Sequence, residues 1–484
     1  MDSAEASIPD IPPDDSSHAS EPAGSPTVER QVQKWTIGTR KPLPTILRAF
    51  RHRNFRLFFA GQFISLTGTW MQSVAQAWLV HQMTGSAVLL GSVMFASQFP
   101  IFLLAPIGGT VADRVNRYRI VLTTQSVAMV LAAILAALTL TGRIEVWHIF
   151  VLASCLGTVN AFDIPARQAF IVSLVGREEM INAIALNSSM FNAARIVGPA
   201  MAGILIGLVG EAWCFFYNAV SYIGVLACLL QMKLAISHTV PPTGSPWMNM
   251  VEGFRYVAQT PPIRALILLL GVVSLTGVPY AVLMPIIAGE VLDAGAHGLG
   301  MLMSSAGVGA LIGALTIAGR RGVRGLGRWV ATASSCFGVS LIMFSLSTNL
   351  WLSAALLVPV GGAMMMQMAA SNTLIQSMVP DRLRGRVMSV YSMMFMGMAP
   401  MGALWAGTIA ESFGAPMAIA LGGGLCLIAS AIFWSVLPSL RVQGRELILA
   451  QQMAAGIIAD DVAGSNPGLA ALQPSNTAEL EKTR

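Results

Sequence analysis

Apolar stretches of about 20 residues recur along the chain, separated by short polar segments. IVLTTQSVAMVLAAILAALTL (Ile120–Leu140) and ALILLLGVVSLTGVPYAVLMPIIA (Ala265–Ala288) are two of them. A helix needs about 20 consecutive apolar residues to cross the hydrocarbon core of a bilayer. The pattern predicts an all-α polytopic membrane protein with twelve transmembrane helices, near residues 55–80, 87–111, 120–141, 147–167, 184–208, 212–232, 263–288, 299–319, 328–348, 351–375, 387–410 and 416–437.

Composition agrees with this interpretation. Of the 484 residues, 55% are apolar and 11% are charged, and the mean hydropathy is +0.66. Soluble domains have roughly 25% charged residues. The lipid bilayer is therefore the expected surroundings of most of the chain.

Lysine and arginine gather in alternate loops. The loops after the predicted spans 1, 5, 7, 9 and 11 have neither residue, and the loop after span 3 has only Arg143. By the positive-inside rule, both termini then lie in the cytoplasm. Because topology explains the net charge of +6, no nucleic-acid partner is expected.

The chain contains an internal repeat. The tetrapeptide SLTG occurs at Ser65–Gly68 and again at Ser274–Gly277, a shift of 274 − 65 = 209 residues. The same shift and a second one of 204 align further residues: Gly91 with Gly300, Gly198 with Gly402, Gly203 with Gly407 and Gly210 with Gly414. This indicates two parallel, pseudo-symmetric halves of six helices, as in transporters whose substrate site lies between repeats.

The repeat and the spans predict the domain organisation. We expect one half at residues 48–232 and the other at 263–440, joined by a cytoplasmic linker at 233–262. Residues 1–47 have no apolar core and predict a disordered cytoplasmic tail, not a signal peptide. Residues 441–484 predict a cytoplasmic C-terminal tail in which ELILAQQMAAGIIA is a candidate surface helix.

A charged loop follows the second span, with the sequence GGTVADRVNRYR. It resembles the loop signature G-x-x-x-D-R-x-x-R-R/K of the major facilitator superfamily, although Asn116 replaces a glycine at a turn position that Asn tolerates. The second half keeps the positive charges but has no acid there. Asp113 would form a contact that breaks between conformations, or else the loop only sets topology. The candidate gating residues are Gly109, Asp113, Arg114, Arg117 and Arg119.

Two longer stretches, Phe162–Gly203 and Val379–Gly407, are similar to exporters of the drug-efflux branch that includes siderophore and macrolide exporters. ARIVGPAMAG resembles the antiporter motif G-x-x-x-G-P-x-x-G-G, in which Gly198, Pro199 and Gly203 would form a packed kink. The alternative is ordinary small-residue packing. The resemblance implies a monomer in the bacterial cytoplasmic membrane that exports small molecules in exchange for protons.

Arg195 is predicted near the bilayer midplane, where a charge faces a cavity or a partner. Three roles stay open: pairing with Asp163, binding an anionic or oxygen-rich substrate group, or bonding to helix carbonyls. Asn192 shares the helical face of Arg195, and Arg167 shares that of Asp163. If protons drive transport, Asp163 and Asp113 are the candidate carriers of the first half. Other acids fall at the outer ends of spans: Glu211, Glu290, Asp293 and Glu411.

The first span has a polar stripe with steps of three and four residues. It either lines a central pathway or forms hydrogen bonds between helices. Spans 10 and 11 are rich in methionine, which suits either a wall for varied apolar ligands or plain filling of the core. The stripe consists of Gln62, Ser65, Thr69, Gln72 and Gln76, of which the three glutamines are candidate substrate contacts.

No enzyme chemistry is apparent in the sequence. HExxH, GxSxG and the phosphate-binding GK[ST] are absent, and neither the histidines nor the cysteines have metal-ligand spacing. No metal or cofactor is expected. The prediction is a secondary active transporter, most simply a proton-coupled exporter of amphipathic small molecules. Alternatives are an importer or facilitator of an anionic metabolite, a lysophospholipid flippase and, more remotely, a membrane receptor or scaffold.

Overall fold

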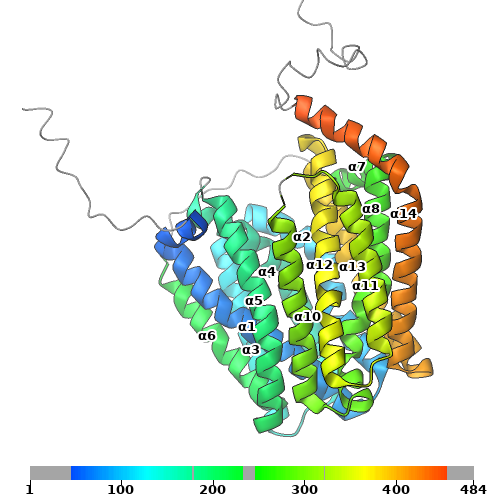
Figure 1. The fold of residues 1–484 in the computed structure, drawn as a ribbon. Coiled ribbons are helices and arrows are strands. Elements are labelled where there is room, and N and C mark those ends of the chain that lie inside the picture. Colours follow the sequence, from blue (N-terminus) through cyan, green and yellow to red (C-terminus); the bar gives the residue numbers. More distant parts are fainter. Residues whose placement is uncertain (1–44, 177–178, 233–245, 321, 455–484) are drawn as a thin grey trace, which may run out of the picture. The chain divides into compact units, whose positions relative to one another are not determined.

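The computed structural model describes residues 45–176, 179–232, 246–320 and 322–454. The chain divides into two units, Met1–Thr45 and Ile46–Arg484, and the helices described here belong to the second. After a short 3₁₀ turn, six long helices form the first half (Figure 1). These elements are η2 (Thr45–Arg51), α1 (Arg53–Thr84), α2 (Ala87–Arg114), α3 (Arg117–Leu140), α4 (Val146–Val175), α5 (Met180–Val209) and α6 (Glu211–Leu230).

The second half begins with a helix that runs through several helical types. Its parts are α8 (Pro261–Val272), η3 (Val273–Gly277), η4 (Val278–Leu283), α9 (Met284–Ile286) and η5 (Ile287–Val291). Pro279 and Pro285 lie within it, and proline removes a backbone donor, which favours such local changes of winding. Five helices follow: α10 (Gly295–Ala318), α11 (Leu326–Ser345), α12 (Leu350–Met378), α13 (Asp381–Phe413) and α14 (Ala415–Ala454).

The helices agree with the predicted spans. Eleven helices of the described residues are long and apolar enough to cross a membrane, and they match the second to twelfth predictions. The first prediction corresponds to α1, whose 32 residues would extend about 48 Å at 1.5 Å per residue. It falls outside the eleven because its polar stripe lowers its hydropathy.

Two segments outside the predicted spans are helical. Within the expected linker, α7 (Pro246–Gln259) forms and lies against α13, where Arg386 of α13 pairs with Glu252. The last helix, α14, continues past residue 440 to Ala454, so the described part of the predicted surface helix ELILAQQMAAGIIA is helical and continuous with the last span, and Figure 1 shows α14 changing direction toward that end. Pro438 lies inside α14 and accounts for such a bend. The predictions for residues 1–44, 233–245 and 455–484 lie outside the described residues.

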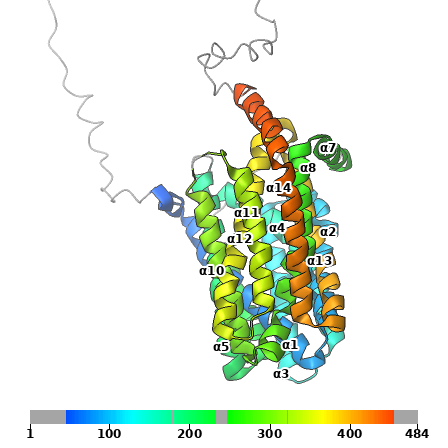
Figure 2. The same cartoon turned by 45° about the vertical axis from the view of Figure 1, so that its right-hand side comes forward.

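The two halves have equivalent helix packing. In the first half α2 packs on α4 and α3 packs on α6, and in the second α10 packs on α12 and α11 packs on α14. Between the halves, the main contacts are α2 with α13 and α5 with α10, as the views in Figures 1 and 2 show. Because the repeat aligns α2 with α10 and α5 with α13, these two contacts are also equivalent to each other.

Glycines allow these two contacts to be close. A Cβ atom added to Gly91 would lie 2.3 Å from the carbonyl oxygen of Ala403 and 3.5 Å from the Cα of Gly407. In the equivalent contact, a Cβ on Gly300 would lie 2.6 Å from the Pro199 oxygen and 2.7 Å from the Gly203 Cα. Four of the glycines that reveal the duplication in the sequence thus form the close contacts between the halves. We call these six residues the inter-half seam: Gly91, Ala403, Gly407, Gly300, Pro199 and Gly203.

Candidate functional site

Asp163 on α4 is the only buried carboxylate among the described residues, with 3% of its surface exposed. Thr124 Oγ1 and Gln125 Nε2 of α3 donate to its Oδ1 at 2.7 and 3.1 Å. Arg167 Nε lies 3.3 Å from its Oδ2. Of the partners considered for Asp163, the structure therefore joins it to Arg167, one turn along the same helix, and not to Arg195. Asp163 pairs with Arg167 because side chains four residues apart share a helix face.

Arg195 on α5 meets no carboxylate within ion-pair distance in the described part of the chain. Its half-buried guanidinium lies over the ring of Trp70, 5.7 Å from the ring centre. Next to it, Ser304 of α10 donates to the Ile196 carbonyl at 2.9 Å. Arg195 is thus a cation at the contact between α5 and α10. Its neighbour Asn192 is buried, with an Oδ1 that no described residue hydrogen-bonds.

Part of the polar stripe on α1 forms hydrogen bonds between helices. Asn218 of α6 donates to Gln72 Oε1 at 2.7 Å inside the first half, and Thr69 lies 3.4 Å from the Tyr222 hydroxyl of the same helix. For Gln72 and Thr69 the structure therefore shows hydrogen bonds between helices. Gln62 is buried, but its Oε1 has no partner among the described residues. The rest of the stripe is buried or half-buried: Ser65 and Gln76.

The signature loop lies where α2 ends and α3 begins. Asn116 caps α3, because its side chain accepts from the Tyr118 backbone N–H at 3.0 Å. Arg117 donates to the Ala112 carbonyl and to the Ala169 carbonyl of α4, at 3.4 and 3.5 Å. The loop is therefore attached to α4. The other signature residues are Gly109, which has open space at its Cβ position, the half-buried Asp113, and the exposed Arg114 and Arg119.

The antiporter-like segment contacts both halves. A Cβ on Gly198 would lie 2.5 Å from the Trp70 Cβ of α1, in the same half. Pro199 and Gly203 pack instead on Gly300 of α10, in the other half. The segment therefore lies at the contact between the halves, and its packing would change if one half moved against the other. The kink itself stays a prediction.

Glu411 is a residue whose role the sequence did not reveal. It lies in the last turn of α13, and its Oε2 accepts from the backbone N–H groups of Ala87 and Val88 at 2.7 and 3.2 Å and from Ser86 Oγ at 3.1 Å. A carboxylate at a helix N-terminus is favourable because it meets unpaired N–H groups and the positive end of the helix dipole. Glu411 therefore holds the start of α2 across the two halves. No motif could have indicated it, because its partner is mainly backbone.

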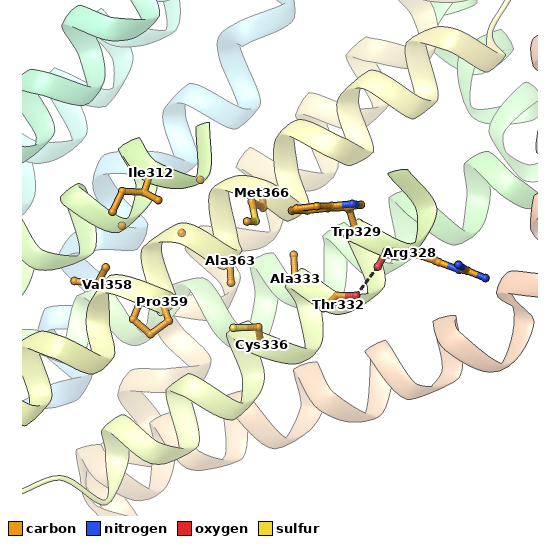
Figure 3. Close-up of a pocket in the computed structure, with 13 residues that line it drawn as sticks. Ile312, Arg328, Trp329, Thr332, Ala333, Cys336, Val358, Pro359, Ala363 and Met366 are labelled. Carbon is orange, nitrogen blue, oxygen red and sulfur yellow. Dashed lines mark hydrogen bonds between the residues drawn. The ribbon is translucent and has the colours of Figure 1, made fainter. Parts of the chain in front are cut away.

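A hollow of about 560 Å³ lies within the second half, among α10, α11 and α12 (Figure 3). Its lining is largely apolar and includes Ile312, Trp329, Val358 and Met366. None of the residues predicted for the site lines it, and it does not lie between the halves. We therefore do not assign it to the transported molecule.

The sequence is similar to a family model and to known proteins. A family model described as transmembrane secretion effector matches residues 45–466. The staphyloferrin A transporter of Staphylococcus aureus is 26% identical over 394 residues, which cover 81% of this chain and 98% of that protein. The enterobactin exporter EntS of Salmonella typhi is 26% identical over 346 residues, which cover 70% of this chain and 82% of that protein.

Solved structures are similar in fold. A POT family transporter in complex with 5-aminolevulinic acid has a TM-score of 0.67 at 11% identity, covering 80% of this chain and 97% of its own. A bacterial homologue of the iron transporter ferroportin has a TM-score of 0.61 at 16% identity, covering 79% and 98%. At such identities the likeness shows a common fold only.

Proposed function

This chain belongs to the transmembrane secretion effector family of the major facilitator superfamily, and from that premise we propose that it exports siderophore-like or drug-like amphipathic molecules in exchange for protons. The family and the relatives make it a membrane transporter. By their names, one relative transports staphyloferrin A and the other exports enterobactin, and both of these molecules are siderophores. The class of substrate, the direction and the coupling to protons are our proposal for this chain.

The surroundings of Arg195 are the observation that most supports the proposed substrate class. A charged side chain inside a membrane protein usually faces a partner or a water-filled cavity. The guanidinium of Arg195 has an aromatic face beside it, Trp70, and no carboxylate among the described residues. Arginine binds carboxylates and other oxygen-rich groups with its planar set of donors. We assign Arg195 to the oxygen-rich part of the substrate and Trp70 to an apolar or aromatic part.

Asp163 supports the coupling to protons. A buried carboxylate held by Arg167, Thr124 and Gln125 can exchange its arginine partner for a proton. Protonation would release Arg167 from the carboxyl and alter the hydrogen bonds between α3 and α4, and the charge of Arg167 would then need another partner or water. We assign Asp163 as the proton carrier of the first half.

The seam supports alternating access. Gly91 and Gly300 lie near the start of α2 and α10, and Gly203 and Gly407 lie near the end of α5 and α13, so all four are at the same end of the bundle. Under the predicted topology this end faces outward. We infer that the structure represents a state closed to the outside, from which rocking of the halves would separate the seam.

Everted membrane vesicles with an acidic interior test the proposal. A panel of cationic drugs, macrolides and catecholate siderophores is added, and a pH-sensitive dye reports collapse of the gradient. We expect collapse by one ligand class, and its loss in Arg195→Ala. The matched control is Arg143→Ala, which removes an exposed arginine from a loop. If Arg195→Ala and Arg143→Ala have equal activity, Arg195 is not part of the substrate site.

A second pair of variants tests the proton carrier. Asp163→Asn keeps the shape of the side chain but cannot exchange a proton, so ligand-induced collapse should disappear while ligand binding persists. Asp293→Asn is the control, because Asp293 is exposed and its positive φ of 48° suits asparagine. If no ligand collapses the gradient although the protein is folded and inserted, proton-coupled export is wrong. Uptake of an anionic metabolite, flipping of a lysophospholipid or a receptor role would then be examined.

A further inference from the structure

A second hollow, of about 640 Å³, opens at the arginine-rich end of the second half. It lies among α8, α12, α14 and the loop that joins α10 to α11. Its inner part is apolar and is lined by Leu266 of α8, Met378 of α12, and Phe433, Leu437 and Leu440 of α14. The apolar lining could cover a hydrocarbon chain.

Three arginines line the same hollow. Arg441 and Arg445 follow one another at i, i+4 and therefore share a face of α14, and Arg324 approaches from the loop. No acidic residue lines the hollow, and none of the three arginines is within ion-pair distance of a carboxylate among the described residues. The hollow thus combines three uncompensated positive charges with an apolar interior.

Local contacts fix this arrangement. Gly444 lies between Arg441 and Arg445, and a Cβ added to it would lie 3.3 Å from Met378 Sδ and 4.0 Å from Pro262 Cβ. The extension of α14 is therefore packed on the ends of α12 and α8. On the other side, Arg320 stacks on the Trp329 ring at 4.7 Å and donates to the Arg324 carbonyl at 3.1 Å. The loop that presents Arg324 is thereby held in place.

We propose that this hollow binds an anionic glycerophospholipid of the cytoplasmic leaflet. The arginine-rich end is cytoplasmic under the predicted topology, and the hollow lies where α14 passes from its apolar span to its polar extension. At that level a phosphate group meets the arginines while the acyl chains extend along the apolar lining. Basic pockets between helices on the cytoplasmic side are a recognised type of site for acidic lipid headgroups. A soluble anion would leave the apolar part of the hollow unused.

The site belongs to the second half alone and is separate from Arg195 and the seam. Its lining comes from α8, α12, α14, the α10–α11 loop and the start of α11, with no residue from the first half. The lipid would therefore stabilise the cytoplasmic end of the second half, and the proposal does not depend on what the protein transports.

Native mass spectrometry of the delipidated full-length protein tests the proposal. We titrate it with phosphatidylglycerol and, separately, with phosphatidylcholine of the same acyl chains. We expect preferential binding of phosphatidylglycerol. In the triple variant Arg324→Gln, Arg441→Gln, Arg445→Gln this affinity should fall about tenfold or more, because each cation near the surface contributes to anionic-lipid binding. The control is a second triple variant with the same change of charge at exposed arginines of the first half, and it should bind phosphatidylglycerol as the wild type does: Arg48→Gln, Arg51→Gln, Arg56→Gln.

Two outcomes would overturn the proposal. One is equal affinity for phosphatidylglycerol in the two triple variants, or no preference over phosphatidylcholine. The other is displacement of the lipid by an equal concentration of glycerophosphoglycerol, the headgroup without acyl chains, which would indicate a soluble-anion site. If the triple variant does not fold, the wild-type protein is crosslinked to a photoreactive phosphatidylglycerol and the crosslinked residues are mapped. Crosslinks to residues 433–452 support the site, and crosslinks confined to other helices refute it.

Discussion

Adding one methyl group to the inter-half seam should open the protein toward the outside. In Gly91→Ala the new Cβ would lie 2.3 Å from the carbonyl oxygen of Ala403, in the other half. A backbone carbonyl cannot rotate away like a side chain, so the two helices have to separate. Only the closed state contains this contact under the rocking hypothesis, and the substitution should therefore destabilise that state alone.

The size of the effect follows from the contact. Overpacking by one methyl group typically costs about 1–3 kcal/mol. Such a difference between two states changes their ratio by about 5- to 150-fold. An outward-open population of about 1% would then rise to between roughly 5% and 60%. The equivalent change Gly300→Ala, with a Cβ 2.6 Å from the Pro199 oxygen, should act in the same direction.

Electron–electron double resonance measures this shift directly. Spin labels are attached at Arg143→Cys and Leu346→Cys, which are exposed residues of the two halves at the end where the seam lies. The five native cysteines are first replaced. We expect Gly91→Ala to increase the fraction of long distances between the labels.

Gly157→Ala is the matched control, because it produces the same kind of clash within one half. Its Cβ would lie 2.2 Å from the Ser97 carbonyl oxygen, between α4 and α2. It should lower the midpoint of thermal unfolding without lengthening the distance between labels. If Gly91→Ala behaves like Gly157→Ala, the seam does not open during transport and the reasoning is wrong.

Three further substitutions have defined outcomes. Glu411→Gln keeps the shape of the cap on α2 but removes its charge. Because such helix-terminal charges contribute about 0.3–1 kcal/mol, the fraction of long distances between the labels should rise about two- to fivefold. An unchanged distance distribution would contradict this role. Asn218→Ala leaves the buried Gln72 acceptor without its donor and should cost about 1–3 kcal/mol, measured as a lower unfolding midpoint, with recovery when Gln72→Leu is added. Asn116→Ala removes the cap of α3 and should cost about 1 kcal/mol in the same assay; wild-type stability would show that the cap is dispensable.

Much of the architecture could be predicted from the sequence. The positions of the spans, the twofold repeat and the family all follow from local patterns such as the apolar runs, the SLTG pair and the GGTVADRVNRYR loop. In a bilayer each helix satisfies its own backbone hydrogen bonds, so its location depends on its own residues. The four seam glycines are among the residues that the repeat aligns, because a close helix contact restricts a position to glycine in both halves.

The local winding of the chain was less predictable. The pattern predicts no helix where α7 forms, and it predicts a separate surface helix at residues 446–459, whereas α14 continues unbroken to Ala454. Both segments are polar enough to lie outside the membrane, and both pack on the ends of other helices. Their helicity therefore depends on tertiary contacts more than on their own sequence.

The partners of the polar side chains were decided by the tertiary structure. Asp163 binds Arg167 and α3, Gln72 binds Asn218, and Glu411 holds the start of α2. The sequence determined which residues are polar and roughly how deep each lies, because depth follows from distance along one helix. It could not determine how each helix is rotated or which neighbour it meets. A side chain acquires a partner only when several helices pack with their faces in one particular orientation, and that orientation is a property of the whole bundle.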